Sequence, residues 1–163
     1  MSAQTVYSFS TPIGQAGGIV DLAPYAVDSF INEAANGEMK FGMGVVRGTK
    51  AGAEVNLPAT GATAGTFEGI VTNRRTSENA LLGGVELRKG ITLGVMRYGR
   101  IYGLLAANVT PAYGDAVYLV ISGDDAGCFT NTSGASAVAV KGRFLGAASD
   151  GIAQIELFNQ AQA

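Results

Sequence analysis

Residues 41–58 read FGMGVVRGTKAGAEVNLP, and this stretch holds the pattern that decides the fold. Its first part, 41–48, is short and rich in valine and glycine, which is typical of a β-strand. Residues 48–52 have the small and polar composition of a turn, and residues 53–58 then alternate apolar and polar side chains until Pro58 stops the strand. Two strands joined by a tight turn indicate an antiparallel β protein.

Segments of the same kind continue to the end of the chain, separated by polar or glycine-containing stretches. Residues 91–97 and 99–106 are expected to form a hairpin that bends near Tyr98 and Gly99. Further strands are expected at 67–72, 81–87, 116–121, 128–130, 137–140, 142–147 and 152–158. Many short strands without a long helix predict a sandwich or barrel.

Residues 1–38 differ from this pattern, and we expect an N-terminal arm there, followed by a β-barrel domain at 39–163. Two structures remain open for residues 21–36. Apolar residues at roughly helical spacing, with Pro24 in the first turn and Gly37 after the end, favour a short helix. The alternative is an extended arm that lies along a neighbouring molecule.

The composition argues against catalysis. The 163 residues include no His, one Cys, 24 Gly and only 15% charged side chains. A chain without His lacks the commonest general base and metal ligand, which excludes Ser–His and Cys–His nucleophilic pairs. We therefore expect a structural or binding protein rather than an enzyme, with no catalytic residue, no cofactor and no metal ion.

Charge and hydropathy argue against two classes of partner, nucleic acids and membranes. The net charge of −2 argues against binding of nucleic acid, which needs clustered Lys and Arg. No apolar run approaches the roughly 20 residues that span a bilayer, so no membrane partner is expected. The N-terminus lacks the basic and apolar regions of a signal peptide, so no signal peptide is expected.

Three local features favour structural roles over chemistry. The series Gly42, Gly44 and Gly48 is similar to a phosphate-binding loop, but no helical pattern follows it, so close backbone approach or a bulge is favoured. The pair Asp124-Asp125 lies in a turn-forming segment without the spacing of a calcium loop. Cys128 precedes Phe129 in an apolar segment and is expected to be a small buried hydrophobe.

Nine blocks of the sequence, taken in order, resemble segments of one known family. They are PIGQAGGIVD at 12–21, FGMGVVRGT at 41–49, VNLP at 55–58, TFEGIV at 66–71, RYGRIYG at 97–103, AYGDAVY at 112–118, GCFTN at 127–131, GRFL at 142–145 and GIAQIEL at 151–157. This series resembles the capsid cement (decoration) proteins of tailed bacteriophages. The stretch 73–89 is longer than the resemblance predicts, so its structure stays open.

The resemblance implies an all-β fold: a compact β-barrel or β-tulip of short antiparallel strands, with an N-terminal arm and at most one short helix. It also implies a structural protein on the capsid exterior of the virion, made in the host cytoplasm, that binds the outer surface of an icosahedral head and cements neighbouring major capsid subunits. Family members commonly form homotrimers at three-fold or quasi-three-fold positions, and the high apolar content, 47%, agrees with self-association.

Candidate capsid contacts lie in the arm and in one loop. They are the apolar residues of the arm and the paired cations of the 73–79 segment: Tyr7, Phe9, Ile13, Ile19, Arg74 and Arg75. An extended arm can add a strand to an exposed sheet edge, although it can equally close one end of the barrel. The alternative function is a small ligand- or carbohydrate-binding β-barrel similar to a phage adhesin, which the lack of Trp disfavours.

Overall fold

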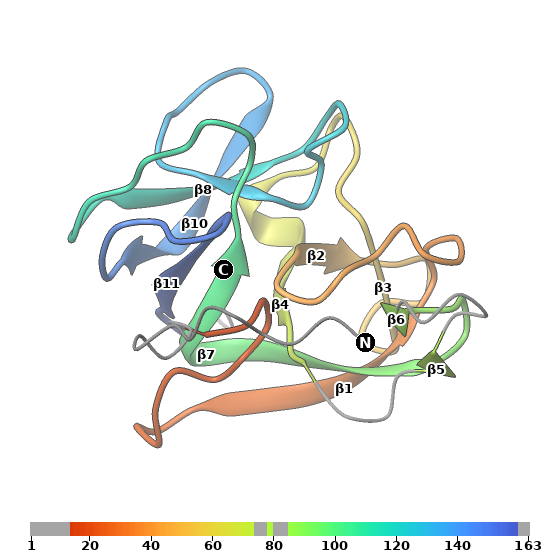
Figure 1. Ribbon diagram of the computed structural model, residues 1–163. Helices are drawn as coiled ribbons and strands as arrows, with labels where there is room; N and C mark the ends of the chain where they lie inside the picture. Colours follow the sequence, from red (N-terminus) through yellow and green to blue (C-terminus); the bar gives the residue numbers. More distant parts are fainter. Residues whose placement is uncertain (1–13, 74–77, 80–84, 160–163) are drawn as a thin grey trace, which may run out of the picture.

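The computed structural model describes residues 14–73, 78–79 and 85–159, and β-strands make up nearly all of its regular structure (Figure 1). One 3₁₀ turn, η1, spans Ala64–Thr66. The strands are β1 Ala26–Asn32, β2 Gly44–Arg47, β3 Glu54–Asn56, β4 Phe67–Val71, β5 Glu78–Asn79, β6 Val85–Glu86, β7 Thr92–Leu104, β8 Ala116–Val120, β9 Phe129–Thr130, β10 Ala137–Phe144 and β11 Ile152–Leu157. No helix among the described residues is both long and apolar enough to cross a membrane.

Five strands close into a barrel in the order β1, β3, β2, β4 and β7, because β7 also pairs with β1. The pairing of β1 with β3 is parallel, and the other pairings of the barrel are antiparallel. The predicted all-β barrel is therefore confirmed.

Strand β7 connects the barrel to the rest of the sheet. Its first half pairs with β1, from Thr92 opposite Ile31 to Tyr98 opposite Ala26. Its second half pairs with β11, from Gly99 opposite Leu157 to Leu104 opposite Ile152. The expectation of a hairpin within 91–106 is wrong: the change of partner at Gly99 replaces a chain reversal, and Figure 1 shows β7 turning as one continuous ribbon.

Beyond β7 the sheet continues through β11, β10, β8 and β9. An isolated bridge joins Leu105, just after β7, to Phe129 in β9. Strand β9 therefore lies beside the end of β7, where this part of the sheet began. The two strands expected at 137–140 and 142–147 are one strand, β10, whose pairing with β8 is irregular between Val140 and Arg143.

Two apolar clusters fill this framework. One lies among the barrel strands and consists of Phe30, Ala34, Met39, Val45, Val55, Val71, Leu87, Leu93 and Val95. The other, larger cluster contains Phe129, Phe144, Ile155 and Leu157, together with Val46, Ile70, Met96 and Ile101 from barrel strands. Since β2, β4 and β7 contribute to both clusters, we expect the two parts to unfold together.

Glycines permit the closest approaches between these parts. A Cβ on Gly44 would lie 2.5 Å from Leu119 Cδ1 and 2.8 Å from Phe129 Cζ, which confirms the predicted close approach in this glycine series. At Gly69, which has φ of +154°, a Cβ would lie 2.2 Å from the carbonyl oxygen of Met96. Strands β4 and β7 can therefore meet at Gly69 only because the residue has no side chain.

Residues 21–36 contain no helix, so the helical alternative is wrong. Ala26–Asn32 is strand β1, and its pairing with β7 overrides the helical spacing of its apolar residues. The buried Asn32 holds the end of this strand: its Nδ2 donates to the carbonyl oxygens of Leu87 and Arg88, at 3.4 and 3.0 Å, and its Oδ1 accepts from Ala34 N. The division of the chain at residue 38 remains a prediction.

The longer stretch at 73–89 contains a second, two-stranded sheet. Glu78 pairs with Glu86 and Asn79 with Val85, in antiparallel register. The single strand expected at 81–87 thus corresponds in part to β6, and residues 80–84 lie outside the described residues.

Candidate functional site

Residues 14–25, which we call the strap, lie along the second half of β7. Gly17 N donates to the carbonyl oxygen of Tyr102, Tyr102 N donates to that of Gly18, and Val20 N donates to that of Arg100, at 2.8, 2.9 and 3.0 Å. An antiparallel bridge joins Ile19 to Ile101 between these bonds. The strap therefore covers the edge of β7 that β11 leaves unpaired.

Strands β7 and β11 place their polar and aromatic side chains on one outer face. The alternate residues Ile101, Ile155 and Leu157 are fully buried in the core. The residues between them lie on the opposite face of the strands and pair in two rows, Tyr102 with Gln154 and Arg100 with Glu156. Tyr102 is buried on this face, with its ring against Gly14 of the strap. Tyr98 and Phe158 lie at the next position along the strands. Gln154 Nε2 donates to Tyr102 Oη at 3.1 Å.

An ion-pair ladder crosses this face, formed by Asp21, Arg100, Glu156 and Arg143. Arg100 Nη1 donates to Asp21 Oδ2 at 2.8 Å, and Arg100 Nε donates to Glu156 Oε1 at 3.2 Å. Arg143 Nε donates to the other carboxylate oxygen of Glu156 at 2.7 Å. The guanidinium carbon of Arg143 also lies 5.6 Å from the centre of the Tyr113 ring, within the range of a cation–π contact.

These contacts keep the ladder charged at neutral pH. The pKa of Asp21 is lowered first by the hydrogen bond from Ala23 N and next by Arg100. The pKa of Glu156 is lowered chiefly by the hydrogen bond from Arg143, and the pKa of Arg100 is raised chiefly by the hydrogen bond to Asp21. Such carboxylates make poor proton donors, so the ladder is suited to fixing the strap on the sheet rather than to acid–base catalysis.

A second group of charged side chains lies at one end of the barrel. Glu68, 5% exposed, contacts Arg47 Nε through Oε1 at 3.1 Å and Arg97 Nη2 through Oε2 at 3.3 Å. Arg97 Nη1 contacts Asp28 Oδ2 at 3.2 Å. These four residues line an open cavity of about 650 Å³ together with Ser29, Phe30, Ala51 and Gly52. The charges of the cavity wall are thus paired with one another.

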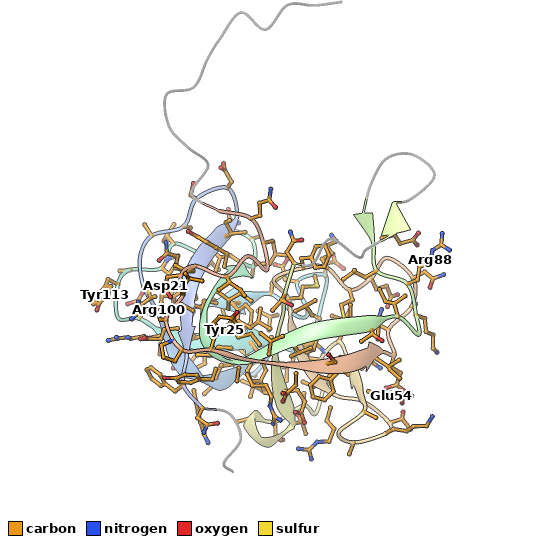
Figure 2. All side chains as sticks on the ribbon, turned by 90° about the horizontal axis from the view of Figure 1, so that it is seen from below. Asp21, Tyr25, Glu54, Arg88, Arg100 and Tyr113 are labelled. Carbon is orange, nitrogen blue, oxygen red and sulfur yellow. The ribbon has the colours of Figure 1, made fainter. Side chains whose placement is uncertain are left out.

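Exposed apolar side chains are unevenly distributed over the described residues. The large ones with substantial exposure are Ile19, Leu22, Tyr25, Ile31, Tyr98, Tyr113 and Phe158. Figure 2 shows Asp21, Arg100, Tyr25 and Tyr113 on one side of the molecule, with Glu54 and Arg88 on the opposite side. Most of the exposed apolar surface therefore accompanies the strap and the outer face of β7 and β11.

The structure assigns packing and turn roles to the residues considered for chemistry. Cys128 is buried, and burial raises the pKa of its thiol to about 11, which removes the thiolate needed for nucleophilic attack. Asp125 Oδ2 accepts from Ala107 N at 3.1 Å and lies in the turn after Gly123. Within the described part of the chain, no three acidic or cysteine side chains gather as metal ligands would.

Of the six candidate contact residues, the structure describes only Ile19. Its side chain is 41% exposed, and its backbone is bridged to Ile101. The other five, Tyr7, Phe9, Ile13, Arg74 and Arg75, lie outside the described residues.

The sequence analysis missed the outer face, although the sequence contains a signal for it. In 98–103, aromatic or charged residues alternate with Gly99, Ile101 and Gly103, and a similar alternation runs through 153–158. In a strand, such alternation places Tyr98, Arg100 and Tyr102 on one face. Their proximity to Asp21 depends on the path of the strap, which no local pattern reveals.

The comparisons with known proteins agree with this architecture. A family model described as "Structural cement protein (E217 gp24/Pam3 gp6)" matches residues 3–158 of the chain. No curated protein matches it. A chain of the solved structure entitled "The capsid of Myoviridae Phage XM1" superposes with a TM-score of 0.74 at 20% sequence identity, over 96% of this chain and 98% of that chain. This likeness shows that the two chains share a fold.

Proposed function

This chain belongs to the family of phage structural cement proteins, and from that premise we propose that it binds the outer surface of an icosahedral phage head as a homotrimer and holds neighbouring major capsid subunits together. A structural, capsid-binding role follows from membership of this family. The family does not favour the alternative function, a ligand- or carbohydrate-binding module. The match over residues 3–158 is the observation that carries the proposal.

The fold supports a mechanical role. A cement protein has to resist forces that pull capsid subunits apart, so it needs a stiff body and contacts spread over its surface. Here a closed barrel and an adjoining sheet share β7, and the strap is fastened to that strand by hydrogen bonds. A load applied to the strap would pass directly into the longest strand of the described chain.

We assign the capsid contacts to the N-terminal arm and to the paired cations after β4. Tyr7, Phe9 and Ile13 precede the strap, whose first residue, Gly14, lies against the ring of Tyr102. Arg74 and Arg75 follow Asn73, whose N donates to the carbonyl oxygen of Gly17 in the strap at 2.7 Å. Both candidate segments therefore begin beside the same part of the strap, which supports a joint contact with one capsid surface.

The role of the arm is tested with two truncations and phage shells that lack this protein. Deleting residues 1–13 is expected to leave a folded protein that sediments with shells far less efficiently. Deleting residues 1–20 also removes the bonds of Gly17, Gly18 and Val20 to β7 and is expected to lower stability as well. Full shell binding by the first truncation would show that the arm makes no essential contact.

The paired cations are tested separately by Arg74→Gln and Arg75→Gln together. Weaker sedimentation with shells at low salt, and a smaller dependence of binding on salt, are expected if these side chains meet acidic capsid groups. The control is Lys40→Gln together with Lys50→Gln, which removes two exposed cations elsewhere on the chain, whereas Arg47 is unsuitable because it contacts Glu68. Binding of the native chain only to the inner surface of shells would contradict an exterior location.

A further inference from the structure

An apolar patch lies where the strap meets the bend of β7 and the end of β11. It consists of Leu22 and Pro24 in the strap, Tyr25 at its end, Tyr98 in β7 and Phe158 just after β11. Leu22 is 95% exposed, and the three aromatic side chains are each between 42% and 48% exposed. These four account for most of the large exposed apolar side chains of the described chain, and such clustering marks an interaction surface.

Three members of the patch, Pro24, Tyr98 and Phe158, line a small groove of about 190 Å³, and Leu22 and Tyr25 flank its strap residues in the chain. Its lining comes from three elements: Ala23 and Pro24 from the strap, Tyr98, Gly99 and Arg100 from β7, and Glu156, Leu157 and Phe158 from the end of β11. The backbone at this groove is fixed, because Ala23 N donates to Asp21 Oδ1 and Phe158 N donates to the carbonyl oxygen of Lys141, at 3.0 and 2.9 Å. The groove is thus formed before any partner arrives.

The charges beside the patch are compatible with contact between identical surfaces. The ion-pair ladder contains two acidic and two basic side chains and so has no net charge, and each of them is paired within the molecule. Copies of the same surface can therefore approach one another without like-charge repulsion. Burying the ladder would also leave no charge without a partner.

We propose that the apolar patch is the contact between copies of this chain on the phage shell. The proposal rests on the proposed function, in which many copies occupy one shell, and it names the surface through which they associate. A stable interface buries about 800 Å² on each partner, and four partly exposed side chains supply less. The contact is therefore weak in solution and becomes effective where the shell holds copies side by side.

The experiment compares two patch variants with a matched control. Leu22→Ser changes a side chain that is almost fully exposed, and the double variant Tyr98→Ser with Phe158→Ser removes two of the three aromatic side chains of the patch. Ile31→Ser is the control, since Ile31 is a similarly exposed apolar side chain, 40% exposed, on β1. Thermal unfolding identifies any variant that fails to fold, and Leu22→Ser keeps the test valid if the double variant does not.

Binding of each protein to shells that lack it is measured from low occupancy to saturation. A copy–copy contact makes native binding cooperative. The patch variants are then expected to bind without cooperativity, with half-saturation raised about tenfold and with unchanged affinity at the lowest occupancy, while the control changes by less than about twofold. Analytical ultracentrifugation at high concentration is expected to show self-association of the native chain and of the control only.

Three results would overturn the proposal. Loss of affinity at the lowest occupancy, with cooperativity retained, would show that the patch contacts the capsid instead. Patch variants identical to the native chain would show that the patch contacts nothing. A native chain that is monomeric at every concentration and binds shells without cooperativity would exclude copy–copy contact. Failure of the native chain to bind shells refutes the proposed function instead, and the ultracentrifugation then still decides whether the patch joins copies.

Discussion

At the end of the barrel, Glu68 is 5% exposed and contacts both Arg47 and Arg97, whereas on the outer face of β7 and β11 the apolar rings of Tyr98 and Phe158 remain more than 40% exposed. The barrel buries most of its apolar residues, with Ile31 as an exposed exception, and pairs the charges of this end with one another. The outer face pairs its charges too, but it leaves apolar side chains in water. The proposed contact between copies therefore rests on this exposed apolar surface and not on unpaired charge.

The two regions are joined by β7, and the first prediction tests whether they behave as one unit. Phe129→Ala is expected to lower the free energy of unfolding by about 3–5 kcal/mol, because a fully buried ring is replaced by a cavity. Leu93→Ala, in the barrel cluster, is the matched change. Both variants should unfold in a single transition by circular dichroism and calorimetry. If the barrel stays native after the region around Phe129 has unfolded, the barrel and the outer sheet are separate folding units.

The second prediction concerns the contact between β4 and β7. Gly69→Ala is expected to cost about 2–4 kcal/mol, because its Cβ would collide with the carbonyl oxygen of Met96 and because the residue has a positive φ. The control is Gly134→Ala, where a Cβ meets open space. Denaturant unfolding measures both. Equal stability of the two variants would mean that β4 and β7 can separate without cost.

The strand pattern of residues 41–58 and of most later segments could be read from the sequence because alternation and turn residues act locally. The hairpin expected in 91–106 was wrong for a non-local reason: Gly99 there marks a change of pairing partner from β1 to β11. Strand β1 was left open for a similar reason, since its helical spacing competes with pairing to a strand that follows much later in the chain.

The candidate site was less predictable than the fold. The alternation around Tyr98 and Phe158 was present in the sequence, but their association with Leu22 depends on the strap lying along β7. The resemblance to a known family provided the function, and the family match has confirmed it. Composition by itself led only to a β-rich protein that associates with others.

The third prediction, with a smaller expected effect, concerns alkaline pH and the buried thiol of Cys128. Burial raises the pKa of this thiol from 9.0 to about 11. Above pH 9 the unfolded chain loses this proton while the folded chain keeps it, so stability falls as pH rises through this window, by about 2 kcal/mol at most. The free energy of unfolding at pH 8 and pH 11 is compared with that of Cys128→Ala. Equal pH dependence in both proteins would exclude the thiol as the cause.

The smallest expected effect concerns the ion-pair ladder, which is compared with the charged group around Glu68. In Arg100→Gln, the pKa of Asp21 is expected to rise while staying below its ordinary value, because the hydrogen bond from Ala23 N remains. A carboxyl group whose pKa is lowered by folding stabilises the fold at pH values above its pKa in the unfolded chain, and this stabilisation is lost as the pH falls. Because the pKa of Asp21 is lowered less in Arg100→Gln, this variant should lose less stability on acidification. Nuclear magnetic resonance titration of Asp21 measures the change. An unaltered Asp21 titration would show that the ladder does not act on it.

The matched change at the barrel end is Arg97→Gln. It removes one of two cationic partners from the buried Glu68, so it is expected to cost more stability at neutral pH than Arg100→Gln, whose partners are more exposed. The same denaturant titration serves for both variants. A larger loss in Arg100→Gln would reverse the comparison between the two regions.

The most direct test is a cryo-electron microscopy reconstruction of phage shells saturated with this protein. The expected map places it on the outer surface in groups of three, with Tyr98 and Phe158 covered by a neighbouring copy and the barrel-end cavity around Glu68 outside that contact. A map in which the protein lines the inner surface, or in which Tyr98 and Phe158 remain uncovered in every copy, would contradict the account.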